Sequence, residues 1–229
     1  MNVICDMAEF FTSFRNSVQA ELKEIINNSP ASFHNILQYH MGWCDKNGYP
    51  YQGKLGKFIR STLCLLSCEA VGGNIEQILP AAATLEFIHN SSLIHDDIQD
   101  GSYERHGRPT VWKLWGQSQA INTGDVMFAL ACLALVKLKK NGVNDEAVVH
   151  SFGLLGGTYQ DLCDGQYLDI EYENRLSITV EDYLNMIRKK TAALIAASTS
   201  LGAYLGKGGE VVSYLYHFGE ALGITYQIR

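Results

Sequence analysis

The stretch EFIHNSSLIHDDIQD, residues 86–100, combines a helical apolar repeat with three carboxylates at its end. Asp96, Asp97 and Asp100 stand close enough for like charges at helical spacing to repel by a few tenths of a kcal/mol per pair, even when exposed. Asp96 and Asp100 project from one helix face, whereas Asp97 is turned by about 100°. Clustered oxygen donors suit Mg²⁺, and a solvated acidic helix end is the plain alternative.

Apolar residues at spacings of three or four extend the helical pattern over most of the chain. Thr179, followed by Asp182 three residues later, has the pattern of a capping box at a helix start. Strand alternation, internal repeats and linkers are missing, so the sequence predicts one all-α domain, a helical bundle over residues 1–229. We expect helices at residues 10–26, 57–71, 75–100, 111–115, 119–140, 144–173, from about 179, and at 210–228.

Composition narrows the classes of function. Of 229 residues 47% are hydrophobic and 18% charged, and the net charge of −6 without a Lys/Arg run argues against nucleic acid as a partner. The six cysteines include no C-x-x-C pair, and no secretory signal opens the chain, so we expect free thiols and a cytoplasmic protein. The longest apolar run, residues 126–136, is shorter than the about 18 residues of a membrane span, which indicates a buried helix and no transmembrane segment.

Three basic groups accompany the acidic cluster. Lys57 and Arg60 lie on one face where an apolar helix begins, although positive charge there opposes the helix macrodipole. The segment RHGRP, residues 105–109, follows the carboxylates, and KKT, residues 189–191, precedes a run of small apolar residues. Each group alone is typical of a solvated surface charge. Together with the carboxylates they indicate a site for diphosphates and a metal ion.

Five motifs, in this order, resemble those of the trans-isoprenyl diphosphate synthases, which include geranylgeranyl and polyprenyl diphosphate synthases. The motifs are GKFIRS (56–61), EFIHNSSLIHDDIQDGSYERHGRPTVW (86–112), GQYLDI (165–170), YLNMIRKKTAALIAAS (183–198) and FGEALGITYQI (218–228). The resemblance covers nearly the whole chain and implies the all-α isoprenoid synthase fold. It also implies a homodimer, for which the apolar helix at 119–136 is the candidate interface.

The resemblance implies a Mg²⁺-dependent prenyltransferase that condenses isopentenyl diphosphate with a C5 to C15 allylic diphosphate. The residues so implicated are Lys57, Arg60, His89 and His106 for isopentenyl diphosphate; Asp96, Asp97 and Asp100 for Mg²⁺; Arg105, Lys190 and Thr191 for the allylic diphosphate; and Gln166 and Gln227 for the reaction chamber. Of these we expect a catalytic role for the three aspartates, Arg105, Lys190, Thr191 and Gln227. They would stabilise the leaving diphosphate and the allylic cation while water is excluded.

Helix geometry gives an expectation for product length. Ser92 and Ser91 stand four and five positions before Asp96, about one turn or roughly 5 Å away, and Ile88 follows on that face. Because serine side chains are small, Ser91 and Ser92 leave room for the growing prenyl chain, which an aromatic side chain at these positions would block. We therefore expect products of C20 or longer.

Three features depart from the resembled pattern. Ser61 stands where the family has proline, a change that we expect to matter little, and His106 replaces a second arginine. The family's second aspartate-rich motif would begin after Arg229, so we expect a synthase domain that is C-terminally incomplete, without its C-terminal helices, and of uncertain activity alone. Two alternatives stay open: a class I terpene cyclase, which has no need of an isopentenyl site, and a non-catalytic or regulatory subunit of a heteromeric synthase.

Overall fold

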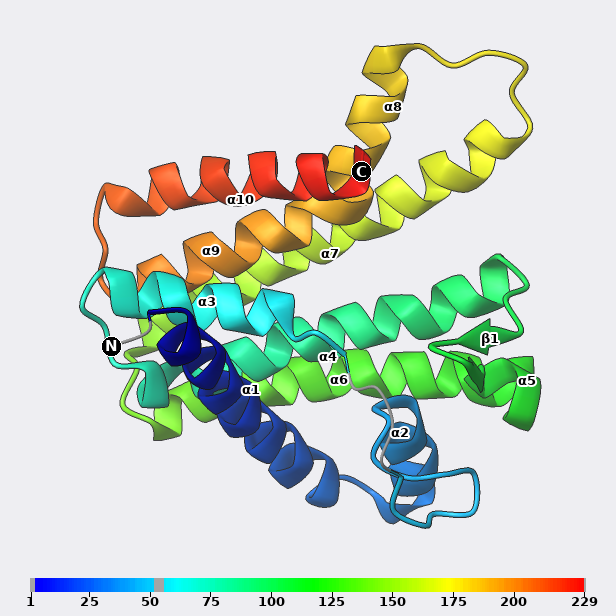
Figure 1. Cartoon of the computed structure of the whole chain (residues 1–229), viewed down its shortest axis with the longest axis horizontal. Helices are drawn as coiled ribbons and strands as arrows, with labels where there is room; N and C mark the ends of the chain where they lie inside the picture. The colour runs from blue at the N-terminus through cyan, green and yellow to red at the C-terminus, as the bar shows by residue number, and fades with distance from the viewer. Residues whose placement is uncertain (1–2, 52–55, 229) are drawn as a thin grey trace.

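The structure, a computed structural model, describes residues 3–51 and 56–228, with the backbone alone for 3–10 and 31. The helices expected from the sequence are present, and the all-α fold is confirmed (Figure 1). In chain order the elements are α1 (Val3–Asn27), a 3₁₀ turn (Ala31–Phe33), α2 (His34–His40), α3 (Ile59–Ala70), α4 (Ile75–Gln99), β1 (Glu104–Arg105), β2 (Arg108–Pro109), α5 (Val111–Trp115), α6 (Gln117–Lys140), α7 (Asp145–Glu173), α8 (Val180–Ile187), a π-helical turn (Arg188–Ala192), α9 (Ala193–Leu205) and α10 (Val211–Ile228).

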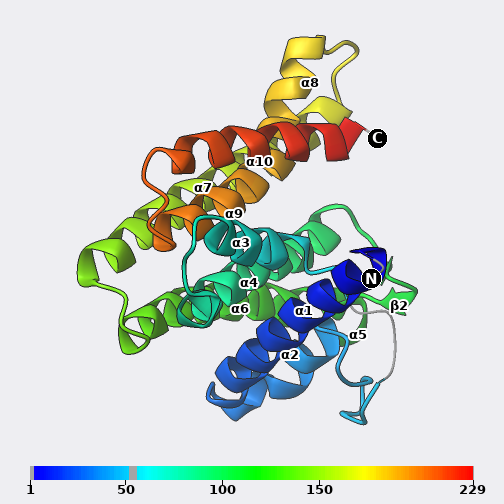
Figure 2. The same cartoon turned by 60° about the vertical axis from the view of Figure 1, so that its left-hand side comes forward.

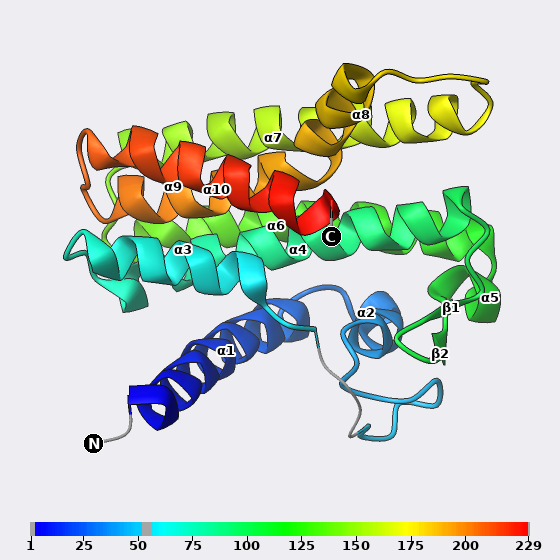
Figure 3. The ribbon, with the colours of Figure 1, turned by 45° about the horizontal axis from the view of Figure 1, so that its top comes forward.

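Helix α4 lies at the centre of the bundle, where it packs against α6, α3, α1 and α9. Figures 1 and 2 place α7, α9 and α10 on one side of α3 and α4, and α1 and α2 on the other. Figure 3 shows the C-terminal end of α4 pointing toward the hairpin of β1 and β2 and the short helix α5. The acidic end of α4 is thus held at the edge of the bundle, beside the hairpin.

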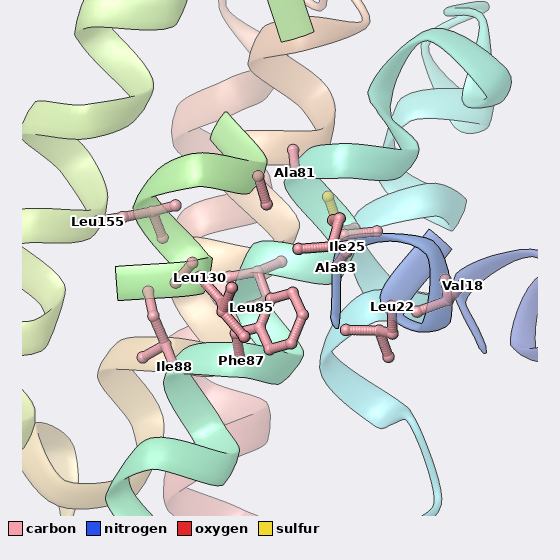
Figure 4. Close-up of a cluster of buried hydrophobic side chains, with 14 of the residues drawn as sticks. Val18, Leu22, Ile25, Ala81, Ala83, Leu85, Phe87, Ile88, Leu130 and Leu155 are labelled. Carbon is pink, nitrogen blue, oxygen red and sulfur yellow. The ribbon is translucent and has the colours of Figure 1, made fainter. Parts of the chain in front are cut away.

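The core gathers around the apolar part of α4. Figure 4 shows Leu85 and Phe87 of α4 among Leu22 of α1, Leu130 of α6 and Leu155 of α7, all of them buried. Burying one such side chain contributes about 1.5–3 kcal/mol relative to leaving it in water. Because neighbours surround α4 on several faces, the helix cannot rotate without exposing apolar surface, and the directions of its terminal carboxylates are fixed.

Several local details differ from the sequence prediction. α1 begins seven residues earlier than expected, at Val3, and α2 lies between residues 27 and 56, where the sequence predicted no helix; residues 52–55 of this segment fall outside the described part. The turn at 106–110 belongs to a two-stranded hairpin, which has too few residues for alternation to reveal it. The capping box at Thr179 and Asp182 is confirmed. The helix that it starts is interrupted by the π-helical turn before α9.

By length and composition, one helix of the described residues, α6, could cross a membrane. Its most apolar window has a mean hydropathy of 1.6, and 44% of that window is buried in the protein. Core helices satisfy the same criterion, and α6 packs along α4. The sequence predicted that this helix is buried. One face of α6 is buried, whereas Ile121, Leu133 and Val136 are exposed.

The described cysteine side chains carry free thiols, at Cys44, Cys64, Cys68, Cys132 and Cys163. The side chain of Cys5 lies outside the described part. Burial raises the pKa of the Cys68 thiol to about 11 and that of Cys64 further, so both stay protonated at neutral pH.

The close contact between α3 and α9 requires a glycine at position 202, because a Cβ there would lie 1.9 Å from the Cys64 carbonyl oxygen. We expect Gly202→Ala to destabilise the fold by about 2–3 kcal/mol, since two backbones would have to separate. The matched control is Gly153→Ala in α7, where no atom lies within 4 Å, and which should stabilise the helix by about 0.5–1 kcal/mol. Urea unfolding measures both, and equal effects would contradict this account.

Candidate functional site

The three carboxylates at the end of α4 face two directions. Asp97 is 2% exposed and accepts two hydrogen bonds at Oδ1 from Arg105, 3.0 Å from Nε and 2.8 Å from Nη2. Asp100 faces α7, where Gln166 Nε2 donates to its Oδ1 over 3.4 Å. Asp96 lies on the same side as Asp100, within the electrostatic influence of Lys190. The cluster therefore serves two neighbouring sites.

The first site is a cavity of about 280 Å³, here called the cation pocket. The end of α2, the start of α3, α4, the hairpin and the end of α10 form its walls. Its basic and imidazole residues come from four of these elements, and Asp97 and Glu86 are the acids that line it. The basic and imidazole side chains are those of Lys57, Arg60, Arg105, Arg108, His40, His89 and His106.

Arg60 has a guanidinium group that is available to an anion. Among the described residues its buried Nε has no hydrogen-bond partner. Glu86 lies close by, but its Oε1 accepts two hydrogen bonds from Ser61, 3.1 Å from the backbone nitrogen and 2.8 Å from Oγ. Burial raises the pKa of Glu86, and these two donors stabilise its charged form. Ser61, which we expected to matter little, therefore satisfies the carboxylate that would otherwise turn to Arg60.

Two half-buried histidines of the pocket are neutral at pH 7. Burial lowers the pKa of His40 to about 3, helped by the charges of Arg105 and Arg108, and its Nε2 donates to Asn90 Oδ1 over 3.1 Å. Burial and the Arg60 charge also hold the pKa of His89 well below its usual range. The neutral His89 ring can donate to an anion without adding to the charge repulsion, whereas the one N–H of His40 is already bonded to Asn90.

The hairpin brings two more basic residues to the pocket. β1 and β2 pair antiparallel, with Arg105 opposite Arg108, and only His106 and Gly107 connect them. Both connecting residues have positive φ, 54° and 75°, as a two-residue type I′ turn requires. The turn therefore presents the His106 side chain at the rim of the pocket, beside Arg105.

The second site, here called the carboxylate site, consists of Asp96, Asp100, Gln166, Lys190 and Thr191. The last two belong to the π-helical turn, a feature that often marks functional positions. That turn lies directly on α7, because a Cβ at Gly165 would come within 2.3 Å of the Lys190 backbone nitrogen. The Lys190 ammonium forms an ion pair with Asp169.

Two observations at the carboxylate site fit a metal ion. Burial raises the pKa of Asp96 to about 6, and repulsion from Asp100 adds to the shift, so a cation would relieve this strain. The Oε1 atom of Gln166 is buried beside Asp100 with no hydrogen-bond partner among the described residues. The described part of the chain has no group of three His, Cys, Asp or Glu side chains that could hold a metal. The site thus suits Mg²⁺, which commonly takes one or two carboxylates with waters and substrate phosphates.

The residues expected to control product length differ in burial and in hydrogen bonding. Ile88 is buried in the core, and Ser91 is fully buried, with its Oγ donating to the Gly124 carbonyl over 2.9 Å. The Tyr159 hydroxyl lies near Ser91, and the centre of its ring lies 4.2 Å from that of Phe128. Ser92 is half-buried, and its hydroxyl is bonded only within α4.

The structure divides the predicted site residues into the two sites. Six of them line the cation pocket: Lys57, Arg60, His89, Asp97, Arg105 and His106. Asp96, Asp100, Gln166, Lys190, Thr191 and Gln227 do not line it. Thr191 donates to Gln227 Oε1 over 2.9 Å, so α10 closes the carboxylate site. Asp97 would have to leave Arg105 to join Asp96 and Asp100 at a metal.

Sequence reasoning did not single out several residues that line the cation pocket, among them His40, Glu86 and Tyr226. His40 belongs to the unpredicted helix α2, and Glu86 was treated as part of an apolar face. The unusual serine at position 61 was the available signal for the Glu86 contact.

Comparisons with known proteins agree with this geometry. The family model of polyprenyl synthetase matches residues 43–229. The short chain isoprenyl diphosphate synthase of Methanothermobacter thermautotrophicus is 44% identical over 76% of this chain and 53% of its own. The geranylgeranyl diphosphate synthase of Mycobacterium tuberculosis is 38% identical over 82% of this chain and 53% of its own. The chain thus spans about half the length of these curated relatives.

A solved structure shares the fold. The polyprenyl synthase from Caulobacter crescentus, crystallised with calcium and isoprenyl diphosphate, superposes with a TM-score of 0.78 at 25% sequence identity. The match covers 95% of this chain and 62% of the crystallised one.

The raised pKa of Asp96 predicts a stability effect that depends on pH. An aspartate with a raised pKa in the folded state costs stability above that pKa, and the cost disappears as it becomes protonated. We expect Asp96→Asn, in EDTA, to raise Tm by about 2–4 °C at pH 7.5 and by less at pH 5.

The control for this prediction is Asp182→Asn, because hydrogen bonds from Thr179 lower the pKa of Asp182. That variant should not raise Tm at either pH. A pH-independent or negative effect of Asp96→Asn would show that the Asp96 carboxylate is not under strain.

Proposed function

The chain belongs to the polyprenyl synthetase family, and from this premise we propose that it condenses isopentenyl diphosphate with an allylic diphosphate. The product would be a trans-prenyl diphosphate of C20 or longer, formed with Mg²⁺. The observation that carries the proposal is the pair of adjoining sites at the end of α4, one cationic and one acidic. Two diphosphate substrates need two such sites, and a single-substrate cyclase does not.

The cation pocket supports the binding of isopentenyl diphosphate. Arg60 offers a buried guanidinium with a free Nε, and Lys57 and His89 lie in the same cavity. Charge-assisted hydrogen bonds to phosphate are about twice as strong as neutral ones, and burial strengthens them further. His106 adds an imidazole donor at the rim in this chain.

The carboxylate site supports the binding of the allylic diphosphate through Mg²⁺ held by Asp96 and Asp100. The bound ion would supply positive charge that stabilises the diphosphate as it leaves. Lys190 would exchange Asp169 for a diphosphate oxygen, and Arg105, between the two sites, would keep Asp97 as its counter-charge. Asp97 thereby orients Arg105.

The reaction begins when the allylic C1–O bond breaks and its electron pair leaves with diphosphate. Thr191 and Gln227, hydrogen-bonded to each other at the carboxylate site, present oxygen dipoles that stabilise the allylic cation. The double bond of isopentenyl diphosphate then forms the new C–C bond. A proton passes to the departed diphosphate, and the new double bond closes the sequence without a covalent enzyme intermediate.

We also propose a homodimer in the cytoplasm. The apolar residues Ile121, Leu133 and Val136 are exposed along α6, and a second copy of the chain would cover them. The net charge of −6 disfavours nucleic acid as a competing partner.

The proposed reaction is tested by incubating the protein with labelled isopentenyl diphosphate, Mg²⁺ and C5, C10 or C15 allylic primers. We expect labelled prenyl diphosphates from the wild type and none with excess EDTA. Asp100→Asn should lower turnover by about 100-fold or more, because a leaving group loses its charge stabilisation. Conversion of an allylic primer without incorporation of label would indicate a cyclase. Activity only as a modifier of a partner synthase would indicate a regulatory subunit.

Product length is tested by substitutions at Ser92. Position 91 is unsuitable because Ser91 is fully buried against Gly124, and a phenylalanine there would overpack the contact. We expect Ser92→Phe to shorten the longest product by one or two C5 units, because the ring would stand one turn from Asp96. Ser92→Ala, which keeps the position small, should leave the product length unchanged. Chromatography of the dephosphorylated products measures the product length of both variants. An unaltered length in Ser92→Phe would refute the inference that small side chains on this face of α4 permit long products.

A further inference from the structure

Arg108 is built into the wall of the cation pocket. Its Nη1 donates to the Tyr39 carbonyl over 2.9 Å and its Nη2 to the Cys44 carbonyl over 2.7 Å. The guanidinium carbon lies 4.0 Å from the centre of the Tyr39 ring and 4.4 Å from that of Tyr51. Both terminal nitrogens thus bind backbone, and two aromatic rings pack against the group.

A second contact runs in the opposite direction. The Tyr39 hydroxyl donates to the Pro109 carbonyl over 2.7 Å, so the end of α2 and strand β2 are joined twice. We call this arrangement of Arg108, Tyr39, Tyr51, Cys44 and Pro109 the Arg108 clamp. The two segments that it joins carry His40 on one side and Arg105 with His106 on the other, and all three line the cation pocket.

The contrast with Arg60 separates two roles for arginine in one pocket. Arg60 has a buried Nε without a partner among the described residues, as a ligand-binding group would before its ligand arrives. The terminal nitrogens of Arg108 are already bonded to the carbonyls of Tyr39 in α2 and of Cys44 in the segment that follows α2. To bind Arg108 as it would bind Arg60, a diphosphate would have to displace these hydrogen bonds and the stacked rings.

We propose that Arg108 is a positioning residue, which fixes the pocket wall so that His106 on the hairpin stays beside Arg60 and His89 for one phosphate group. The proposal rests on the proposed function, since it takes the anion to be the diphosphate of isopentenyl diphosphate. Its physical basis is the planar guanidinium, which reaches two carbonyls at once and stacks on aromatic rings. A lysine ammonium cannot do both, although it carries the same charge.

The test compares Arg108→Lys with Arg108→Gln, using inorganic pyrophosphate as the probe in titration calorimetry. A positioning role predicts that both variants lose about tenfold in pyrophosphate affinity. It also predicts that KM for isopentenyl diphosphate rises to a similar extent, while kcat and KM for the allylic primer stay within about twofold. The matched control is Arg175→Lys, since Arg175 also packs on a tyrosine, Tyr172 at 5.0 Å, and does not line the pocket.

Two results would overturn the proposal. If Arg108→Lys binds pyrophosphate like the wild type while Arg108→Gln does not, Arg108 is a direct ligand, because charge alone suffices. If both variants bind normally, or both substrates are affected alike, the clamp does not shape this pocket.

Tyr39→Phe keeps the test open if the Arg108 variants fail to fold, since it removes only the hydroxyl bonded to Pro109. This variant should weaken pyrophosphate binding by about threefold, and normal binding would count against the clamp. Pyrophosphate binding is measured without turnover. If the wild type binds pyrophosphate but makes no prenyl product, the proposed function is wrong. The role of the Arg108 clamp is still tested in that case by the pyrophosphate affinities of the variants.

Discussion

Consecutive residues of an α-helix cannot face the same way, and this constraint shapes the whole site at the end of α4. Asp96 and Asp97 are turned from each other by about 100°, so one carboxylate faces α7 while the next faces the hairpin. The buried body of α4 prevents a compensating rotation, because rotation would bring Phe87 and Leu85 out of the core. An acidic pair adjacent in sequence thereby becomes the boundary between a cationic pocket and a carboxylate site.

The second requirement is close backbone contact, which brings the π-helical turn to the carboxylate site. α7 approaches that turn at Gly165, and any side chain there would push Lys190 away from Asp96. The hydrogen bond from Thr191 to Gln227 then fixes the end of α10 over the same site. The π-helical geometry, rather than a regular helix, sets the directions of Lys190 and Thr191. Small residues and one irregular turn thus position groups that come from three separate helices.

The sequence predicted the helices and the participating residues better than their arrangement. Apolar periodicity gave the limits of α4 within one residue, and the Thr179 capping box was found as expected. Periodicity indicated that Asp97 is turned away from Asp96 and Asp100, but it could not reveal the hairpin, whose strands have two residues each, or the bond from Arg105 that holds Asp97. Those features depend on residues that are distant in the sequence. The same holds for Ser61, whose role depends on the carboxylate of Glu86, 25 residues away in the chain.

The Ser61 contact also explains how a cationic pocket can keep an internal acid. Glu86 is buried next to Arg60, and a buried carboxylate without donors either takes a proton or pairs with the nearest cation. A proline at position 61 would supply neither the N–H nor the hydroxyl that Glu86 now accepts. With serine in place, Glu86 is satisfied from the side of α3, and the Arg60 guanidinium stays available to the cavity. The availability of Arg60 therefore depends on two neutral donors as much as on its own charge.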